Sequence, residues 1–120
     1  SCTPPFCQYA GLEAVVGDQS ELKRMKDEYL ERKKILVHGL NEVKGISCVD
    51  PGGAMYVFPN IKDTGMNSND FSEYVLDKIG VGVLPGNNFG KKGEGYIRMC
   101  YATSQDDIIL ALSRLKELFG

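Results

Sequence analysis

Apolar residues recur every three or four positions in four segments of the chain. These segments cover residues 6–16, 22–43, 71–79 and 108–119. Because this spacing places apolar side chains on one face of a helix, it predicts four helices. The second helix is long and ends near Asn41, and Asp18 with Glu21 forms a capping-box pattern at its start.

The third and fourth helices also have candidate capping residues. Ser68 or Asn69 is expected to cap the third helix, and Ser104 with Asp107 the fourth, because short polar side chains accept hydrogen bonds from the first free N–H groups of a helix. Between the helices the apolar period shortens to that of strands, in segments 46–48, 54–59, 81–84 and 96–102. Pro51 and Gly52 favour a type II turn over residues 50–53.

The resulting order, α-α-β-β-α-β-β-α, predicts an α/β fold in which helices cover a small sheet, an α+β layered sandwich. A chain of 120 residues is typical of one domain with one core. No apolar stretch approaches the roughly 20 residues of a membrane span, and no apolar signal segment is present. We therefore expect one cytoplasmic domain with no membrane partner.

The charges argue against nucleic acid as a partner. The chain has 14 basic and 16 acidic residues, which leaves a net charge of -2. Counterion-release binding to nucleic acid requires an excess of positive charge that this balance lacks. The basic run at 23–34 is interleaved with acids, and Glu28 lies four residues before Arg32, which favours a solvated, self-paired helix face over a basic docking patch.

Cysteine and histidine usage predicts no metal site. Cys2, Cys7, Cys48 and Cys100 form no Cys-x-x-Cys pair, and the single His38 has no second ligand at metal-binding spacing. The four cysteines are expected to be free thiols in a reducing compartment, acting mostly as small buried apolar side chains. His38 is expected to be an ordinary surface or core residue rather than a catalytic base.

Arg98 is the most informative residue for chemistry. In the strand at 96–102 the alternation of faces places Ile97, Met99 and Tyr101 on one side and Arg98 on the other. A guanidinium cannot shed its charge, so Arg98 must either reach an internal carboxylate or face a site where an anion binds. The acidic residues elsewhere in the chain keep the internal ion pair open. In the second case, the planar fork selects a carboxylate.

The glycine-rich loop at 85–95 does not fit the known phosphate-binding patterns. Counting back from Gly90 and Lys91, the first glycine of a P-loop is replaced by Pro85, and Lys92 stands where Ser or Thr holds magnesium. The segment before the loop also lacks the last glycine of a dinucleotide fingerprint. The loop is therefore either a mobile or tight turn or a ligand contact, since glycine permits both.

Three segments together resemble the C-terminal domain of class I/II pyridoxal-phosphate-dependent aminotransferases. They are residues 50–59 (DPGGAMYVFP), 83–90 (VLPGNNFG) and 93–102 (GEGYIRMCYA). Residues 1–16 resemble the segment that follows the cofactor region. The resemblance implies the small domain of fold type I pyridoxal-phosphate enzymes, with residues 1–120 as that domain and the large domain absent.

The resemblance also implies roles for particular residues. Arg98 stands where the family places the arginine that binds the substrate α-carboxylate, and Asn88 and Phe89 lie in a loop near the substrate side chain. The implied reaction moves an amino group between an amino acid and a 2-oxo acid. No catalytic, cofactor-binding or metal-binding residue is expected in this chain.

The implied cofactor site lies elsewhere. In the family, the lysine that forms the Schiff base, the phosphate-binding groups and the acid paired with the pyridine nitrogen precede the region matched here. We expect pyridoxal 5'-phosphate in the full-length parent, a homodimer, and an inactive isolated chain. Two alternatives are a related pyridoxal-phosphate lyase, decarboxylase or synthase, and a non-enzymatic α/β binding or regulatory module in which Arg98 is a structural ion pair.

Overall fold

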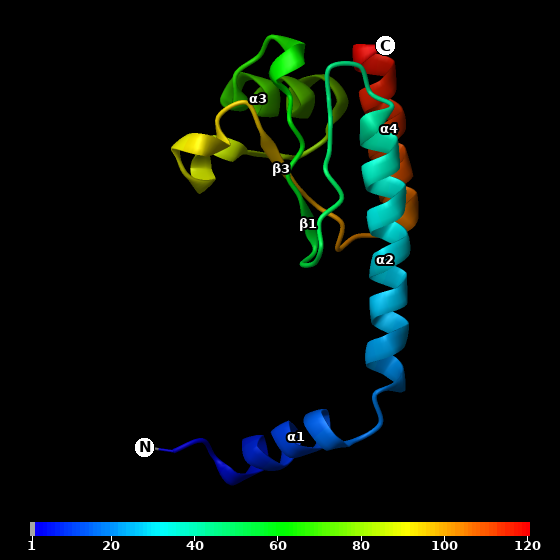
Figure 1. The fold of residues 1–120 in the computed structure, drawn as a ribbon, viewed down its shortest axis with the longest axis vertical. Coiled ribbons are helices and arrows are strands. Elements are labelled where there is room, and N and C mark those ends of the chain that lie inside the picture. The colour runs from blue at the N-terminus through cyan, green and yellow to red at the C-terminus, as the bar shows by residue number, and fades with distance from the viewer. Residues whose placement is uncertain (1) are drawn as a thin grey trace.

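The computed structural model, which describes residues 2–120, places a small sheet beside a pair of long helices, with one helix standing apart (Figure 1). The helices within this range are α1 (Pro5–Val16), α2 (Ser20–Asn41), α3 (Ser68–Ile79) and α4 (Gln105–Phe119). The strands are β1 (Tyr56–Val57), β2 (Leu84–Pro85) and β3 (Ile97–Cys100). The four predicted helices and the layered α/β arrangement are confirmed.

The strands form one antiparallel sheet in the order β1–β3–β2, with β3 at its centre. Tyr56 of β1 pairs with Cys100, and Leu84 of β2 pairs with Arg98. Alternate side chains at this strand are buried in the core: Ile97, Met99 and Tyr101. Arg98 is partly exposed on the opposite face. The predicted alternation is confirmed, and the sheet presents Arg98 on its outer face between two neighbouring strands.

The core lies between the inner face of the sheet and helices α2, α3 and α4. Its buried helical residues include Leu36, Leu40, Phe71, Val75, Leu112 and Leu115. Full burial of one such side chain contributes about 1.5 to 3 kcal/mol. Phe71 also stacks on Phe119, with ring centroids 5.4 Å apart. These residues occupy the predicted apolar positions, so the helical spacing identified the core faces correctly.

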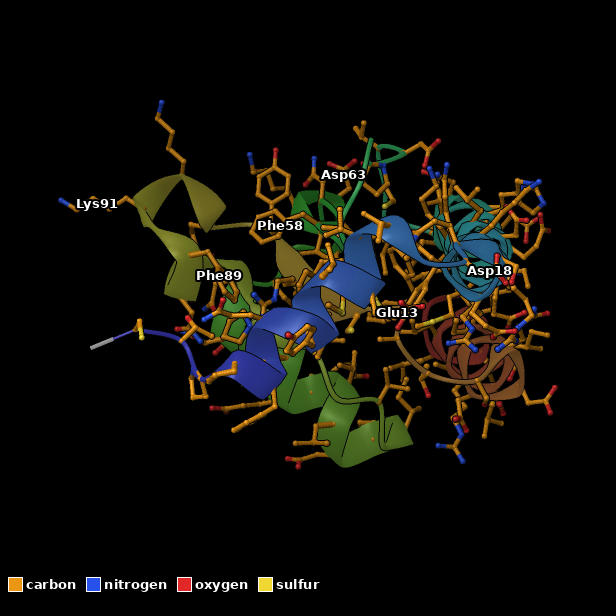
Figure 2. The ribbon with its side chains drawn as sticks, turned by 90° about the horizontal axis from the view of Figure 1, so that it is seen from below. Glu13, Asp18, Phe58, Asp63, Phe89 and Lys91 are labelled. Atoms are coloured by element: carbon orange, nitrogen blue, oxygen red, sulfur yellow. The ribbon has the colours of Figure 1, made fainter. Side chains whose placement is uncertain are left out.

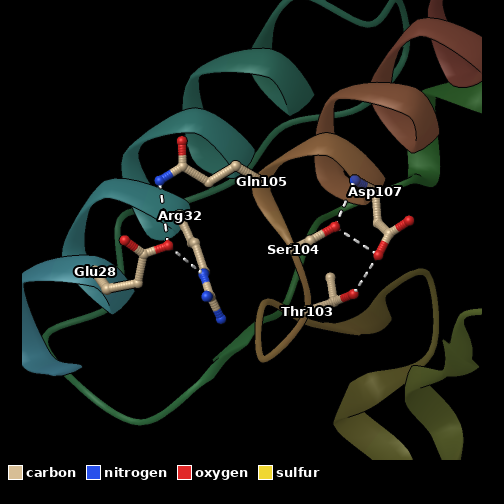
Figure 3. A network of polar contacts seen from close by, with 6 residues as sticks. All are labelled: Glu28, Arg32, Thr103, Ser104, Gln105 and Asp107. Carbon is tan, nitrogen blue, oxygen red and sulfur yellow. Dashed lines mark hydrogen bonds and ion pairs between the residues drawn. The ribbon is translucent and has the colours of Figure 1, made fainter.

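Polar contacts join the start of α4 to α2 (Figure 3). Asp107 N donates to Ser104 Oγ at 3.1 Å, and Ser104 Oγ donates to Asp107 Oδ2 at 2.7 Å, so the predicted cap is confirmed. Gln105 Nε2 donates to Glu28 Oε1 at 3.3 Å. Glu28 also accepts from Arg32 Nε at 3.0 Å, which confirms the self-paired face of α2.

Helix α1 lies outside the core, across the end of α2 that is remote from the sheet (Figure 1). None of its residues is buried, and its large apolar side chains are 57% to 77% exposed. These side chains are Phe6, Tyr9, Leu12, Val15 and Val16. Leu22 and Met25 at the start of α2 are exposed as well. No helix among residues 2–120 combines the length and the apolar composition that crossing a bilayer requires.

The predicted capping box at the start of α2 is wrong. The helix begins at Ser20, and Asp18 and Glu21 make no reciprocal contact. Asp18 Oδ1 instead accepts a hydrogen bond from Ser20 N at 3.0 Å. The carboxylate of Asp18 is therefore engaged in a local turn before the helix starts. Glu21 pairs with Arg24 and not with the start of the helix.

The cap of α3 lies one residue before Ser68 and two before Asn69, the two predicted candidates. Asn67, rather than Ser68 or Asn69, is the N-cap, and its side chain accepts from Asp70 N at 2.9 Å. Ser68 lies in the first turn of the helix and is fully buried. Its hydroxyl faces the glycine-rich loop and is unavailable to cap the helix.

The predicted order α-α-β-β-α-β-β-α contains one strand too many, because the observed order is α-α-β-α-β-β-α. Residues 46–48 form only an isolated bridge between Ser47 and Asn60. The side chain of Asn41 accepts from Cys48 N and donates to Cys48 O, both at 2.9 Å. Because these backbone groups bond to a side chain instead of a neighbouring strand, the segment is a loop.

The strand predicted at 81–84 is also displaced, since its pairing begins at Leu84. Val81 N donates to Val75 O at the end of α3, at 3.3 Å, so this part of the chain continues the helix end. Leu84 is 46% exposed rather than buried. The pairing of β2 with β3 therefore starts only at Leu84, which lies opposite Arg98.

The type II turn predicted for residues 50–53 is wrong. Such a turn needs a positive φ at Gly52, which the structure does not have. The left-handed residue is Ala54, with φ 63°. The hydroxyl of Tyr101 donates to Ala54 O and holds this conformation from the end of β3.

Candidate functional site

Arg98 lies between two aromatic rings on the outer face of the sheet. Its Cζ is 4.4 Å from the ring centroid of Tyr56 and 4.1 Å from that of Phe89. Tyr56 comes from β1, and Phe89 comes from the 3₁₀ turn Gly86–Phe89 that follows β2. Each contact of this kind contributes about 0.5 to 2 kcal/mol. The two rings restrict where the guanidinium can lie.

Within the described part of the chain, the internal ion pair considered for Arg98 is not formed. The chain has three other arginines, and each holds a protein acceptor: Arg24 a glutamate, Arg32 a glutamate and Arg114 the carbonyl of Ile79. Within residues 2–120, no Asp or Glu forms a salt bridge with Arg98. Its N–H fork is therefore available to a ligand, which is the condition for the anion site predicted from the sequence.

A hollow of about 230 Å³ opens beside Arg98. It is lined by Tyr56, Gly82, Val83, Leu84, Arg98 and Cys100. Arg98 is the only charged residue in this lining, which contains neither a lysine nor an acid. A small anion entering the hollow would meet one cationic fork in an otherwise mostly apolar surface.

An aromatic strip extends the surface around the hollow. Phe58 packs edge-on to Phe89 with ring centroids 6.1 Å apart, and stacks on Tyr96 at 5.6 Å. Figure 2 shows Phe58 and Phe89 next to each other, while Lys91 points away from them. Phe58 and Phe89 remain 39% and 47% exposed. The surroundings of the fork are thus suited to apolar contacts.

Of the two loop residues predicted at the site, Phe89 contacts Arg98. Asn88 is on the same turn and is exposed, whereas the side-chain oxygen of Asn87 is buried without a hydrogen-bond partner among the described residues. Tyr56 was not predicted as a site residue, although it lies in the segment 50–59 that resembles the family. The register of β1 against β3 would have identified it, because residues diagonal to each other on one face are in contact range.

The free thiols differ in environment from the prediction. Cys2, Cys7 and Cys100 are exposed, and only Cys48 is buried. Burial, with a further contribution from the charge of Asp50, raises the pKa of Cys48 to about 11. The expectation of mostly buried thiols is wrong because α1 and the residues before it are exposed, and Cys100 is on the outer face of the sheet.

We expect the four thiols to separate by reactivity. Since the thiolate is the nucleophile, the raised pKa lowers the reactive fraction of Cys48 about 100-fold. A thiol-exchange reagent at pH 8 should label three cysteines quickly and Cys48 slowly. All four should react at similar rates in denaturant, and equal rates in the native protein would contradict the assignment.

Metal chemistry has no support among residues 2–120, where no three His, Cys, Asp or Glu side chains are placed to hold an ion.

His38 was predicted to be an ordinary surface or core residue, and it lies on the surface with its side chain 80% exposed. Its Nε2 lies 3.2 Å from Glu42 Oε1. Glu42 also pairs with Lys116, and the two contacts lower its pKa.

Comparison with known proteins agrees with this architecture. The family model for aminotransferase class I and II matches residues 1–115. The chain is 48% identical over 114 residues to an aspartate aminotransferase of Pyrococcus horikoshii, and the match covers 93% of the chain and 29% of that protein. It is 39% identical over 120 residues to an aromatic-amino-acid aminotransferase of Thermococcus litoralis, and this match covers 98% of the chain and 31% of that protein.

A solved structure extends the agreement to the fold. The crystal structure of an aromatic aminotransferase from Pyrococcus horikoshii superposes with a TM-score of 0.88 at 42% identity, and covers 94% of this chain and 30% of that one. The chain therefore spans about 30% of the length of the relatives that it matches.

Proposed function

Because the chain belongs to the class I and II aminotransferase family, we propose that residues 1–120 form the C-terminal small domain of a pyridoxal-phosphate-dependent aminotransferase. The full-length enzyme moves an amino group between an amino acid and a 2-oxo acid. Within it, this domain binds the substrate carboxylate through Arg98. The domain assignment is supported by the share of the relatives' length that the chain spans.

The observation that carries this proposal is the fork of Arg98, held between two rings and without a protein carboxylate. The rings of Tyr56 and Phe89 both lie close to the guanidinium, and among residues 2–120 no carboxylate pairs with its N–H groups, which leaves them to a ligand. A carboxylate accepts two parallel N–H bonds there, worth about 3 to 6 kcal/mol gross. Amino acids and 2-oxo acids both carry a carboxylate next to the reacting carbon, so one arginine serves both substrates.

We assign the loop beside the fork to the substrate side chain. Phe89 has nearly half of its surface free for an apolar contact. Asn88 is exposed next to it and supplies amide donors and acceptors. The mostly apolar lining of the hollow suits aromatic side chains. The names of the relatives include aspartate and aromatic-amino-acid aminotransferases, so aspartate and aromatic amino acids are the first substrates to assay.

The residues of this chain do not fit the cofactor by themselves. Pyridoxal phosphate needs a lysine as its covalent anchor and an acid near its pyridine nitrogen, and the lining of the hollow at Arg98 contains neither. A second hollow is bordered by Lys26 and Lys33, but its lining contains no acid. Lys33 is also engaged by Asp50 at 2.7 Å and by the carbonyl of Pro51 at 3.0 Å. We therefore place the cofactor site in the large domain of the full-length protein.

Helix α1 supports a partner of this kind. The apolar residues of α1 lie on all sides of the helix and not on the single face expected from their spacing. Such a helix is stable in water only when it is covered, and α1 has no buried residue here. We propose that the large domain of the same protein covers α1 and the start of α2. We further propose that the full-length enzyme is a homodimer and, since its four thiols suit a reducing compartment, that it is cytoplasmic.

The isolated chain is expected to be inactive. With a stoichiometric amount of pyridoxal phosphate it should develop no imine absorbance band, because it lacks the anchoring lysine and its surroundings. It should also exchange no amino group between L-aspartate, L-phenylalanine or L-tyrosine and 2-oxoglutarate. The full-length protein should develop the imine band and should exchange the amino group.

The products of the full-length protein distinguish the reactions of this cofactor family. Stoichiometric formation of glutamate and a new 2-oxo acid supports amino transfer. Release of carbon dioxide or ammonia instead would identify a decarboxylase or a lyase. A stoichiometric imine band together with amino exchange by the isolated chain would contradict the assignment of the cofactor site to another domain.

A further inference from the structure

Glu94 connects the glycine-rich loop to helix α3. Its Oε1 accepts hydrogen bonds from Ser68 N at 2.9 Å, Ser68 Oγ at 3.1 Å and Gly95 N at 3.0 Å. Ser68 Oγ in turn accepts from Gly95 N at 2.9 Å. One carboxylate oxygen thus binds two segments that are 26 residues apart in the sequence.

The loop that Glu94 holds is the one that brings Phe89 to Arg98. Gly86 N donates to Tyr96 O at 2.8 Å, and Gly93 N donates to Gly90 O at 2.9 Å. Residues 86–93 therefore form a compact loop that leaves the sheet and returns to it. Its two ends converge beside α3. The position of Phe89 relative to the guanidinium therefore depends on how the two ends of this loop are fixed.

We infer that Glu94 is a positioning residue for Arg98: it fastens the base of the 86–93 loop to the start of α3 and thereby holds Phe89 against the guanidinium. The inference rests on the proposed carboxylate-binding role of Arg98. Glu94 itself touches neither Arg98 nor the hollow. Its contribution is the orientation of the fork.

The environment of Glu94 suits a permanent contact. The N-terminus of α3 presents free N–H groups and the positive end of the helix dipole to the carboxylate. The hydrogen bonds from Ser68 and Gly95, with the side chain of Asn87, lower the pKa of Glu94 against the opposing effect of desolvation. A carboxyl with a lowered pKa is ionised in the folded protein throughout the neutral range. The contact is lost only as the pH falls through that pKa.

The test uses the full-length enzyme with the variants Glu94→Gln, Glu94→Ala and Ser68→Ala. We expect Glu94→Ala to raise the KM for the amino acid and for 2-oxoglutarate about 3- to 30-fold, with a smaller change in kcat. Glu94→Gln retains an acceptor oxygen and should give an intermediate KM. Ser68→Ala should raise the KM in the same direction.

Asp107→Asn is the matched control. Asp107 is also an acid at the start of a helix, where its side chain accepts from Ser104 Oγ and Thr103 Oγ1 (Figure 3). None of its hydrogen bonds among residues 2–120 reaches the 86–93 loop. We expect it to lower the melting temperature as the Glu94 variants do and to leave both KM values unchanged. Equal increases in KM for Asp107→Asn and Glu94→Gln would overturn the positioning role, because general destabilisation would then explain both.

The variant Arg98→Lys separates the two proposals. If it raises the KM while Glu94→Gln and Ser68→Ala do not, the positioning role is wrong and the carboxylate site stands. If none of these variants changes the KM, the carboxylate site itself is wrong and the positioning role falls with it. Should Glu94→Ala fail to fold, the other two variants decide the matter by the same comparison.

Discussion

Arg98→Lys in the full-length enzyme is expected to raise the KM for amino acids about ten- to a thousand-fold, which corresponds to a loss of about 1.5 to 4 kcal/mol. Lysine retains the charge but not the planar fork, so it cannot give the carboxylate two parallel hydrogen bonds. It also lacks the planar, delocalised group that lies close to the rings of Tyr56 and Phe89 in the native protein. Steady-state kinetics with the best amino acid of the aspartate, phenylalanine and tyrosine panel measure the effect.

The increase should appear mainly in KM. A carboxylate contact is made in the bound substrate and in the transition state alike, so its loss weakens both states together. Arg114→Lys is the control, because Arg114 donates to the carbonyl of Ile79 at 3.0 Å, away from the aromatic pair. An unchanged KM in Arg98→Lys would remove Arg98 from the substrate site.

Gly93→Ala should destabilise the protein by about 3 kcal/mol, at the upper end of the usual cost of overpacking. A Cβ at this position would lie 2.0 Å from Gly86 O and 2.5 Å from Gly86 C. Both are backbone atoms, so no side chain can rotate away and the two ends of the 86–93 loop must separate. Denaturant unfolding measures the loss, and the displacement of Phe89 should raise the KM as well.

Gly53→Ala is the matched substitution for this experiment. A Cβ added to Gly53 would have no atom within 4 Å beyond its own chain neighbours, and the residue has no positive φ, so the methyl group meets open space. We expect its free energy of unfolding to stay within about 0.5 kcal/mol of the parent value. Similar values for the two alanine variants would mean that the loop tolerates a wider base than the structure has.

The helices and the face of Arg98 were predictable because they depend on local periodicity. The spacing of Leu36 and Leu40, of Phe71 and Val75, and of the apolar residues of α4 follows directly from burial on one face. The alternation along β3 likewise requires only the pleat of a strand. These properties do not depend on which segments meet across the fold.

Features that depend on long-range partners were not predictable in the same way. The loop at Cys48 replaces a strand because Asn41 binds its backbone, and the strand at 81–84 starts late because Val81 bonds to the end of α3. The contact of Tyr56 with Arg98 depends on the register of β1 against β3. Local pattern carries no information about such choices between alternative partners.

Helix α2 has a mechanical consequence for the assembled enzyme. Its 22 residues make a rod about 33 Å long, packed into the core at its C-terminal half and free of the core where it leads to α1. A rod clamped at one end works as a lever. A displacement of whatever surface covers α1 would act on the free end of α2, and the packed half of the helix would carry that displacement into the core beneath the sheet.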